Sequence, residues 1–310
     1  MKRPETHEGI ASLRKFLREN PKYVVYDYSS VSKYEECHAK YNYVYNHWLR
    51  DSESVAALFS SMLIHPPLAN WYLSGGRRPW VPPEWQSGWD LFQAAVSSLP
   101  TTRRDALYTL TVAQRLVISY TELFRRDFET YKVLSTERVY WSVFPGAENA
   151  LWVTKPDLLL ERADKERITF DFKTSLYDFN AHLVDFDRQF LGQAYGTGAK
   201  HVCKAFMRIP TAYNEMLINR EILPIDEELL NEWFVEMGQT IMEIQRARET
   251  GVWVKQAPAG CTAYNRMCVF IDLCKLGKTR EGMIDIAEKR HPFTYLGLGG
   301  SEQESPNEES

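Results

Sequence analysis

The sequence lacks any long run of apolar residues, although 44% of its 310 residues are hydrophobic. No window approaches the roughly 18 consecutive apolar residues that a membrane-spanning helix requires. The first residues, MKRPETHEGIASLRKF, contain no apolar stretch of the signal-peptide kind. We therefore expect a globular protein of the cytoplasm with no membrane partner.

The chain also lacks a strong excess of charge of one sign. Its net charge is −4, and four of its 41 acidic residues lie in the last ten, SEQESPNEES, so the other 300 residues carry 37 acidic and 37 basic side chains. A neutral body cannot attract nucleic acid through a general positive field, so any such partner must meet local basic tracks. The candidates are Arg77, Arg78, Arg103, Arg104 and the Arg125–Arg126 pair, although such pairs also occur on ordinary solvated helix faces.

Cysteine is scarce, with five residues, and a cytoplasmic chain keeps its thiols reduced, which excludes a disulfide scaffold. Three of the five, Cys261, Cys268 and Cys274, lie within 14 residues of one another. Such spacing suggests a soft metal or an iron–sulfur cluster, with Cys37 as the candidate fourth ligand. A buried thiol is the simpler reading of a free cysteine, and it is the one we expect for Cys203 in the apolar run VCKAF.

The hydrophobic periodicity changes along the chain from helical to extended and back. Helical patterns cover 34–45, 52–64, 103–131, 182–198 and 226–249, with a Pro/Gly/Trp-rich loop over 74–90. Between 132 and 173 lie three extended runs joined by short turns, which predict an antiparallel meander, and KHVCKAFMRI predicts a further strand. The order predicts an α/β protein.

Two aspartates and a lysine fall on the last two runs of that meander. Asp157 lies in KPDLLLER and Asp171 in ITFDFKTS, so one strand and a turn can bring them together at one end of a hairpin. Lys173 shares a strand face with Asp171, because side chains two residues apart point the same way. Two carboxylates suit Mg²⁺ or Mn²⁺, and an adjacent ammonium suits phosphodiester hydrolysis. The alternative is an exposed Asp–Lys pair of little energetic value.

The residues KPD at 155–157 and DFK at 171–173 resemble the PD-(D/E)XK nuclease superfamily. The resemblance implies a restriction-endonuclease-like core, in which a mixed central β-sheet is flanked by helices. It also implies that Asp157, Asp171 and the Phe172 carbonyl bind the metal, with Lys173 beside the attacking water.

Further motifs resemble the RecB-like branch of that superfamily, which includes the CRISPR-associated adaptation exonucleases. SSMLIHPP supplies a small residue four positions before His65, which the resemblance makes a further metal ligand. DRQFLGQAYG supplies Gln189 in a catalytic supporting role, with Gln193 where the branch has tyrosine, and Tyr195, two positions later, as a further candidate catalytic residue. Glu137 falls where relatives often carry an acid, although an exposed strand glutamate fits equally.

The four cysteines resemble the [4Fe–4S] ligands of the same branch, in which one upstream cysteine, here Cys37, joins three near the C-terminus. The resemblance implies a clasp between the two ends of the chain. Zinc is the competing ligand, although zinc sites favour tighter C-x₂-C pairs.

Taken together, the motifs predict a Mg²⁺- or Mn²⁺-dependent deoxyribonuclease of a bacterial or phage-infected cell, acting as an exonuclease on single-stranded DNA or duplex ends. Recombination, repair, phage DNA metabolism or spacer acquisition are the expected processes, with recombination or CRISPR-type protein partners. The alternative is a non-catalytic DNA-binding scaffold with the same fold. The expected regions are a helical 1–131 carrying Cys37 and His65, a nuclease core 132–255, a cysteine-rich segment 256–300 and a disordered acidic tail 301–310.

Overall fold

The computed structural model describes residues 5–51, 54–97, 107–177, 187–262, 267–287 and 289–298. The chain forms two compact units, which we call the first unit (Met1–Thr6, Glu53–Tyr140 and Thr154–Trp233) and the second unit (His7–Ser52, Trp141–Val153 and Phe234–Ser310). Both units draw residues from the ranges 1–131 and 132–255, so they interleave along the sequence. The expected tail, 301–310, lies outside the described residues, as do Arg103 and Arg104.

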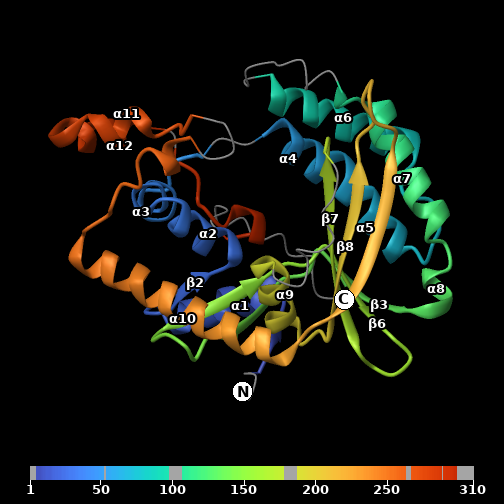
Figure 1. The fold of residues 1–310 in the computed structure, drawn as a ribbon, viewed down its shortest axis with the longest axis horizontal. Helices are drawn as coiled ribbons and strands as arrows, with labels where there is room; N and C mark the ends of the chain where they lie inside the picture. The colour runs from blue at the N-terminus through green and yellow to red at the C-terminus, as the bar shows by residue number, and fades with distance from the viewer. Residues whose placement is uncertain are drawn as a thin grey trace. The chain divides into compact units, whose positions relative to one another are not determined.

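The first unit is built on a five-stranded mixed sheet (Figure 1). Strands β7 and β8 are parallel, and the other neighbouring pairs are antiparallel. The strand order across the sheet is β3 (Lys132–Thr136), β6 (Leu158–Glu161), β7 (Arg167–Ser175), β8 (His201–Arg208) and β9 (Leu217–Pro224).

Helices cover both faces of this sheet. In its central strand β7, successive side chains point to opposite faces. Ile168, Phe170 and Phe172 of β7 face one way, into the large core that α5, α6 and α7 close. Thr169, Asp171 and Lys173 occupy the alternate positions, on the other face of the strand. Helix α9 (Arg188–Thr197) packs against that face through an apolar cluster with β8. The predicted α/β class with a helix-flanked mixed sheet is confirmed.

The remaining helices of the first unit lie before the sheet in the chain. They are α4 (Val55–Phe59), the π-helical turn η2 (Ser60–Ile64), α5 (His65–Leu73), α6 (Pro82–Val96), α7 (Leu110–Leu123) and α8 (Asp127–Thr130). The double proline after His65 falls in the first turn of α5, where a missing N–H breaks no helical hydrogen bond. His65 therefore lies at the junction of η2 and α5, where its N–H donates to the Ser60 carbonyl.

The second unit holds a four-stranded sheet of order β1-β4-β5-β2, in which β2 and β5 are parallel. Its strands are β1 (His7–Glu8), β2 (Val24–Tyr26), β4 (Tyr140–Val143) and β5 (Ala150–Thr154). Its helices are α1 (Ile10–Glu19), α2 (Tyr28–Glu36), α3 (His38–Tyr41), η1 (Asn42–Asn46), η5 (Ala259–Cys261), α11 (Ile271–Lys275), η7 (Gly277–Thr279), α12 (Arg280–Ile286) and η8 (Thr294–Leu296), and most of α10 (Glu227–Thr250) belongs to it.

The structure differs from the sequence-based expectations in three places. The predicted loop 74–90 is wrong in its second half, because Pro82 and Pro83 start α6 and Glu84 caps it by accepting the Val81 N–H at 2.6 Å. The expected simple meander is also wrong, since each of its first two runs is divided into two strands that belong to different sheets. Strand β9, with its mixed polar sequence LINREILP, was not predicted.

Among the described residues, no helix combines the length and apolar character that crossing a bilayer requires.

Candidate active site

The β6–β7 hairpin sets the two predicted aspartates at the same level of the sheet. Leu158 pairs with Phe170, so the next pair outward is Asp157 and Asp171. The Phe172 N–H donates to Asp157 Oδ2 at 2.6 Å, which ties the end of β6 to the Asp-x-Lys segment. Both aspartates are buried. The hairpin geometry predicted from the 13 intervening residues is therefore present.

His65 joins this hairpin from the start of α5. Its Nε2 lies 3.1 Å from the Phe172 carbonyl oxygen and 3.1 Å from Ser60 Oγ, and its Nδ1 lies 3.4 Å from Asp157 Oδ1. The imidazole thus contacts both the Asp157 carboxylate and the Phe172 carbonyl, through its two different ring nitrogens. The sequence distance between them, from 65 to 172, is closed by the packing of α5 on β7.

Glu137 joins His65 and Asp157 in one cluster of side chains. It follows β3 in a turn with a positive φ of 50°, which aims its carboxylate at His65, with Oε1 at 3.6 Å from Nδ1. Lys155 pairs with its other oxygen at 2.6 Å. The ligand atoms of His65, Glu137 and Asp157 lie within 4.8 Å of one another, close enough for one ion. The reading of Glu137 as an exposed strand residue is wrong, because the side chain is half-buried and lies outside the strand.

The protonation of this cluster reflects burial and charge together. Burial raises the pKa of Asp157 to about 7, against the opposing effect of His65. Burial lowers the pKa of His65, but the nearby carboxylates, Asp157 foremost, raise it further, to about 9. Without an ion, His65 is therefore an imidazolium whose protons bridge the carboxylates and the carbonyl. A divalent cation would take over the same charge balance.

Asp171 belongs to a second, adjoining group with Lys173 and α9. Its Oδ2 lies 2.8 Å from Lys173 Nζ, and its Oδ1 accepts from Gln189 Nε2 at 2.8 Å. Gln189 Oε1 in turn accepts from Lys173 Nζ at 3.1 Å, which closes a triangle of three side chains. Burial lowers the pKa of Lys173, but the Asp171 charge raises it more, so the group is an ammonium cation at neutral pH.

Helix α9 presents one face to this triangle. Gln193, one helical turn after Gln189, lies 3.5 Å from Asp171 Oδ1 and accepts from Thr169 Oγ1 at 3.2 Å. Tyr195 is six residues after Gln189, on another face of the helix, and its buried ring packs on Trp233 at 5.3 Å. The two glutamines thus surround Asp171, whereas the Tyr195 ring is placed in the packing between α9 and α10.

The four candidate cluster cysteines gather within the second unit. Cys37, Cys268 and Cys274 share one apolar cluster, and the Cys268 N–H donates to the Cys261 carbonyl at 2.8 Å. Gly260 allows the closest approach, since a Cβ there would come within 3.1 Å of the Cys37 Cβ and 2.6 Å of the Glu36 carbonyl. The upstream cysteine and the three downstream ones are therefore brought to one place.

The fifth cysteine, Cys203, has a different environment. It is fully buried in the core of the first unit, and its pKa is raised, mainly by burial. Its thiol stays protonated and packs as a small apolar group, as expected from the sequence.

Comparisons with known proteins give only distant likenesses. No protein-family model and no curated protein matches the chain. Among solved structures, a protein from Eubacterium rectale provisionally named an exonuclease is 16% identical, with a TM-score of 0.48, covering 81% of this chain and 90% of that one. SSO0001 is 12% identical (TM-score 0.30, 74% and 84% covered), and LHK-Exo in complex with dAMP is 14% identical (TM-score 0.26, 63% and 97% covered). Identities and TM-scores this low carry no information about the chemistry of this chain, which has to be inferred from the geometry of its own side chains.

Proposed function

We propose that this chain is a metal-dependent deoxyribonuclease of the PD-(D/E)XK type, RecB-like, that acts as an exonuclease on single-stranded DNA or duplex ends. The observation that carries the proposal is the convergence of His65, Asp157 and the Phe172 carbonyl from distant segments, with the Asp171–Lys173 pair on the next positions of the same strand. An ordinary exposed salt bridge between an aspartate and a lysine would explain neither the burial of the two aspartates nor the histidine beside them.

The donor set fits a divalent cation of intermediate hardness. One imidazole, carboxylates and a backbone carbonyl combine ligands that suit Mn²⁺ and Mg²⁺, and the nitrogen favours Mn²⁺ of the two. His65, Asp157, the Phe172 carbonyl and Asp171 would hold the ion, with Glu137 as a further donor. When bound, such an ion supplies Lewis-acid activation of water and neutralises charge on the phosphate.

The remaining chemistry falls to the triangle of Asp171, Lys173 and Gln189. Lys173, whose pKa the Asp171 charge raises, would serve as a cation and hydrogen-bond donor that positions the nucleophilic water and offsets phosphate charge. Gln189 fixes the ammonium through its amide oxygen and Asp171 through its amide nitrogen. This orienting role needs no proton transfer by the glutamine.

The test is cleavage of end-labelled linear single-stranded, blunt duplex and circular DNA with Mn²⁺ and Mg²⁺. We expect Asp171→Asn and Lys173→Met each to lower the rate by about 100-fold or more, while linear DNA is degraded and circles resist. The matched control is Lys165→Met, since Lys165 lies in the turn of the same hairpin and its side chain is 78% exposed. Equal, metal-independent inactivity of wild type and Asp171→Asn would instead support the non-catalytic DNA-binding scaffold.

The cysteines extend the proposal to a [4Fe–4S] cluster held by Cys37, Cys261, Cys268 and Cys274, with zinc as the alternative. Their gathering in the second unit supports a shared ligand. The order of the motifs from Cys37 to Cys274 favours a role for this protein in recombination, repair, phage DNA metabolism or spacer acquisition. It would act there with protein partners of those pathways.

A further inference from the structure

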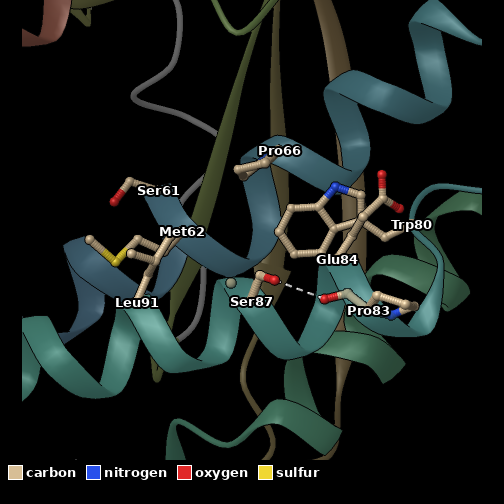
Figure 2. A pocket seen from close by; sticks show the side chains of 9 residues that line it. Ser61, Met62, Pro66, Trp80, Pro83, Glu84, Ser87 and Leu91 are labelled. Atoms are coloured by element: carbon tan, nitrogen blue, oxygen red, sulfur yellow. Dashed lines mark hydrogen bonds between the residues drawn. The ribbon is translucent and has the colours of Figure 1, made fainter.

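A cavity of about 530 Å³ lies in the first unit between η2, α5 and α6 (Figure 2). That size falls within the range of about 300–1,000 Å³ common to small-ligand sites. Figure 2 shows the Trp80 indole on one side of the pocket and Met62 and Leu91 on the other. Leu91 is 64% exposed, so the pocket leaves a large apolar side chain in contact with solvent.

The Trp80 wall is held in place by its surroundings. The indole packs edge-on against Trp85 at 5.0 Å, and Trp85 is buried. Gly88 of α6 makes room for it, because a Cβ at that position would come within 2.8 Å of the indole ring. The ring is therefore fixed before any ligand arrives, which lowers the entropy cost of stacking on it.

The polar side chains of the pocket are those of Ser61, Ser87 and Glu84, and the Glu84 carboxylate accepts from the Val81 N–H at 2.6 Å. Ser87 Oγ donates to the Pro83 carbonyl at 3.0 Å, and Ser61 Oγ donates to the Leu58 carbonyl at 3.3 Å. Each hydroxyl has a single hydrogen, so each can offer the pocket only an acceptor. The lining holds no Lys or Arg, so a phosphate would find no counter-charge there. A planar, weakly polar ring with hydrogen-bond donors fits better.

The pocket also adjoins the candidate active site through the chain itself. Pro66 lines the pocket and directly follows His65, while Ser61 lines it and directly follows Ser60, which contacts His65 Nε2. Consecutive Cα atoms are about 3.8 Å apart, so the wall of the pocket and the metal-binding side of α5 are one structural element.

We propose that this pocket binds one unpaired nucleobase of the DNA strand, stacked on Trp80 and adjacent to the scissile position. The inference rests on the proposed nuclease function for its choice of ligand. It implies a preference for single-stranded DNA, because a paired base cannot enter. It also implies that bases with exocyclic amino groups, which can donate to the two serine hydroxyls, bind better than thymine.

The test uses fluorescence anisotropy of a labelled short oligodeoxyadenylate, its thymidylate counterpart and an abasic strand of equal length. All proteins carry Asp171→Asn to prevent cleavage. Trp80→Ala should weaken adenylate binding by about 5- to 150-fold, the range for loss of one base–aromatic stack, and Trp80→Phe by less. The abasic strand should bind with the same low affinity to the protein that retains Trp80 and to the Trp80→Ala variant. Tyr213→Ala is the control, since Tyr213 is an aromatic residue that is 96% exposed elsewhere in the unit.

A second variant guards against misfolding by Trp80→Ala. Gly88→Ala keeps the indole but displaces it, and should also weaken adenylate binding while the thermal unfolding midpoint confirms an intact fold. Unchanged affinity in Trp80→Ala, or equal binding of adenylate and abasic strands to the protein that carries Asp171→Asn alone, would overturn the proposal. So would binding of a leucine-rich amphipathic peptide that depends on Trp80 while DNA binding does not.

The outcome separates this inference from the proposed function. If the unmutated protein cleaves DNA and Trp80→Ala changes neither KM nor affinity, the pocket proposal fails alone. If no cleavage is seen but adenylate binding depends on Trp80, the pocket stands and the catalytic proposal fails.

Discussion

A buried ion pair on the core side of the first unit gives a sharp test of its packing. Asp127 of α8 accepts both Arg220 guanidinium nitrogens, at 2.5 Å each, and the two side chains are only 5% and 13% exposed. Tyr72 of α5 donates to the same carboxylate at 2.7 Å, and its hydroxyl lies 3.1 Å from that of Tyr120. The guanidinium also stacks over Phe124, 3.8 Å from the ring centroid. This network joins α5, α7, α8 and β9.

Removing one charge of such a pair leaves the other uncompensated in the core. Asp127→Asn should therefore lower the free energy of unfolding by about 3–5 kcal/mol, and Arg220→Met by a similar amount. Because folded proteins are stable by only about 5–15 kcal/mol, either loss is a large fraction of the total. The double variant removes both charges and should cost clearly less than the sum of the two single variants, by about 2 kcal/mol or more.

Urea unfolding followed by tryptophan fluorescence measures these differences. Asp90→Asn serves as the control, because Asp90 is an exposed aspartate of α6 that accepts from Gln86 at 2.8 Å, and it should change stability by less than about 0.5 kcal/mol. A loss below about 1 kcal/mol in Asp127→Asn, or strict additivity in the double variant, would show that solvent screens the pair and would refute the reasoning.

Two further predictions concern the metal centres. Because the nearby carboxylates raise the pKa of His65 to about 9 against the effect of burial, a metal ion must displace a proton below that pH; the Mn²⁺ affinity measured by calorimetry should fall about tenfold per pH unit as the pH drops from 9, and more steeply below 7, where burial also keeps Asp157 partly protonated. An affinity that is flat from pH 9 to pH 6 would contradict this sign. Cys268→Ser should abolish the broad absorbance near ~400 nm and the bound iron of anaerobically purified protein, whereas Cys203→Ala should retain both. A colourless wild type that contains zinc would replace iron–sulfur with the alternative.

Local sequence patterns predicted strand β7 well, because the alternation of its side chains is contained in a short stretch of sequence. The run ITFDFKTS alternates apolar and polar residues, and that alternation alone puts Asp171 and Lys173 on one face and Phe170 and Phe172 on the other. The partner strand and tight turn likewise follow from a short stretch of chain, so the Asp157–Asp171 level of the hairpin could be anticipated.

Features that depend on distant contacts could not be anticipated in the same way. Glu137 reaches His65 only because a turn of positive φ ends β3, and no residue in that turn is a glycine that would signal it. Strand β9 has a half-exposed, polar sequence at the edge of the sheet, where the pairing with β8 rather than the pattern determines the structure. The first turns of helix α6 were predicted as a loop because they are rich in Pro and Trp, although prolines at the start of a helix favour it.

The residue between Asp171 and Lys173 is as much a part of the site as its neighbours. The Phe172 ring lies on the core face, 5.6 Å from Tyr120 and 6.4 Å from Tyr72, while its N–H holds Asp157 and its carbonyl faces His65. The backbone of one residue thus contacts two candidate ligands, and its ring packs near Tyr72, which donates to Asp127, and near Tyr120, whose hydroxyl contacts that of Tyr72. Phe172 therefore contacts both the Tyr72 side of the Asp127–Arg220 network and the candidate metal site. A change in core packing at the tyrosines should alter ligand geometry before it alters the fold.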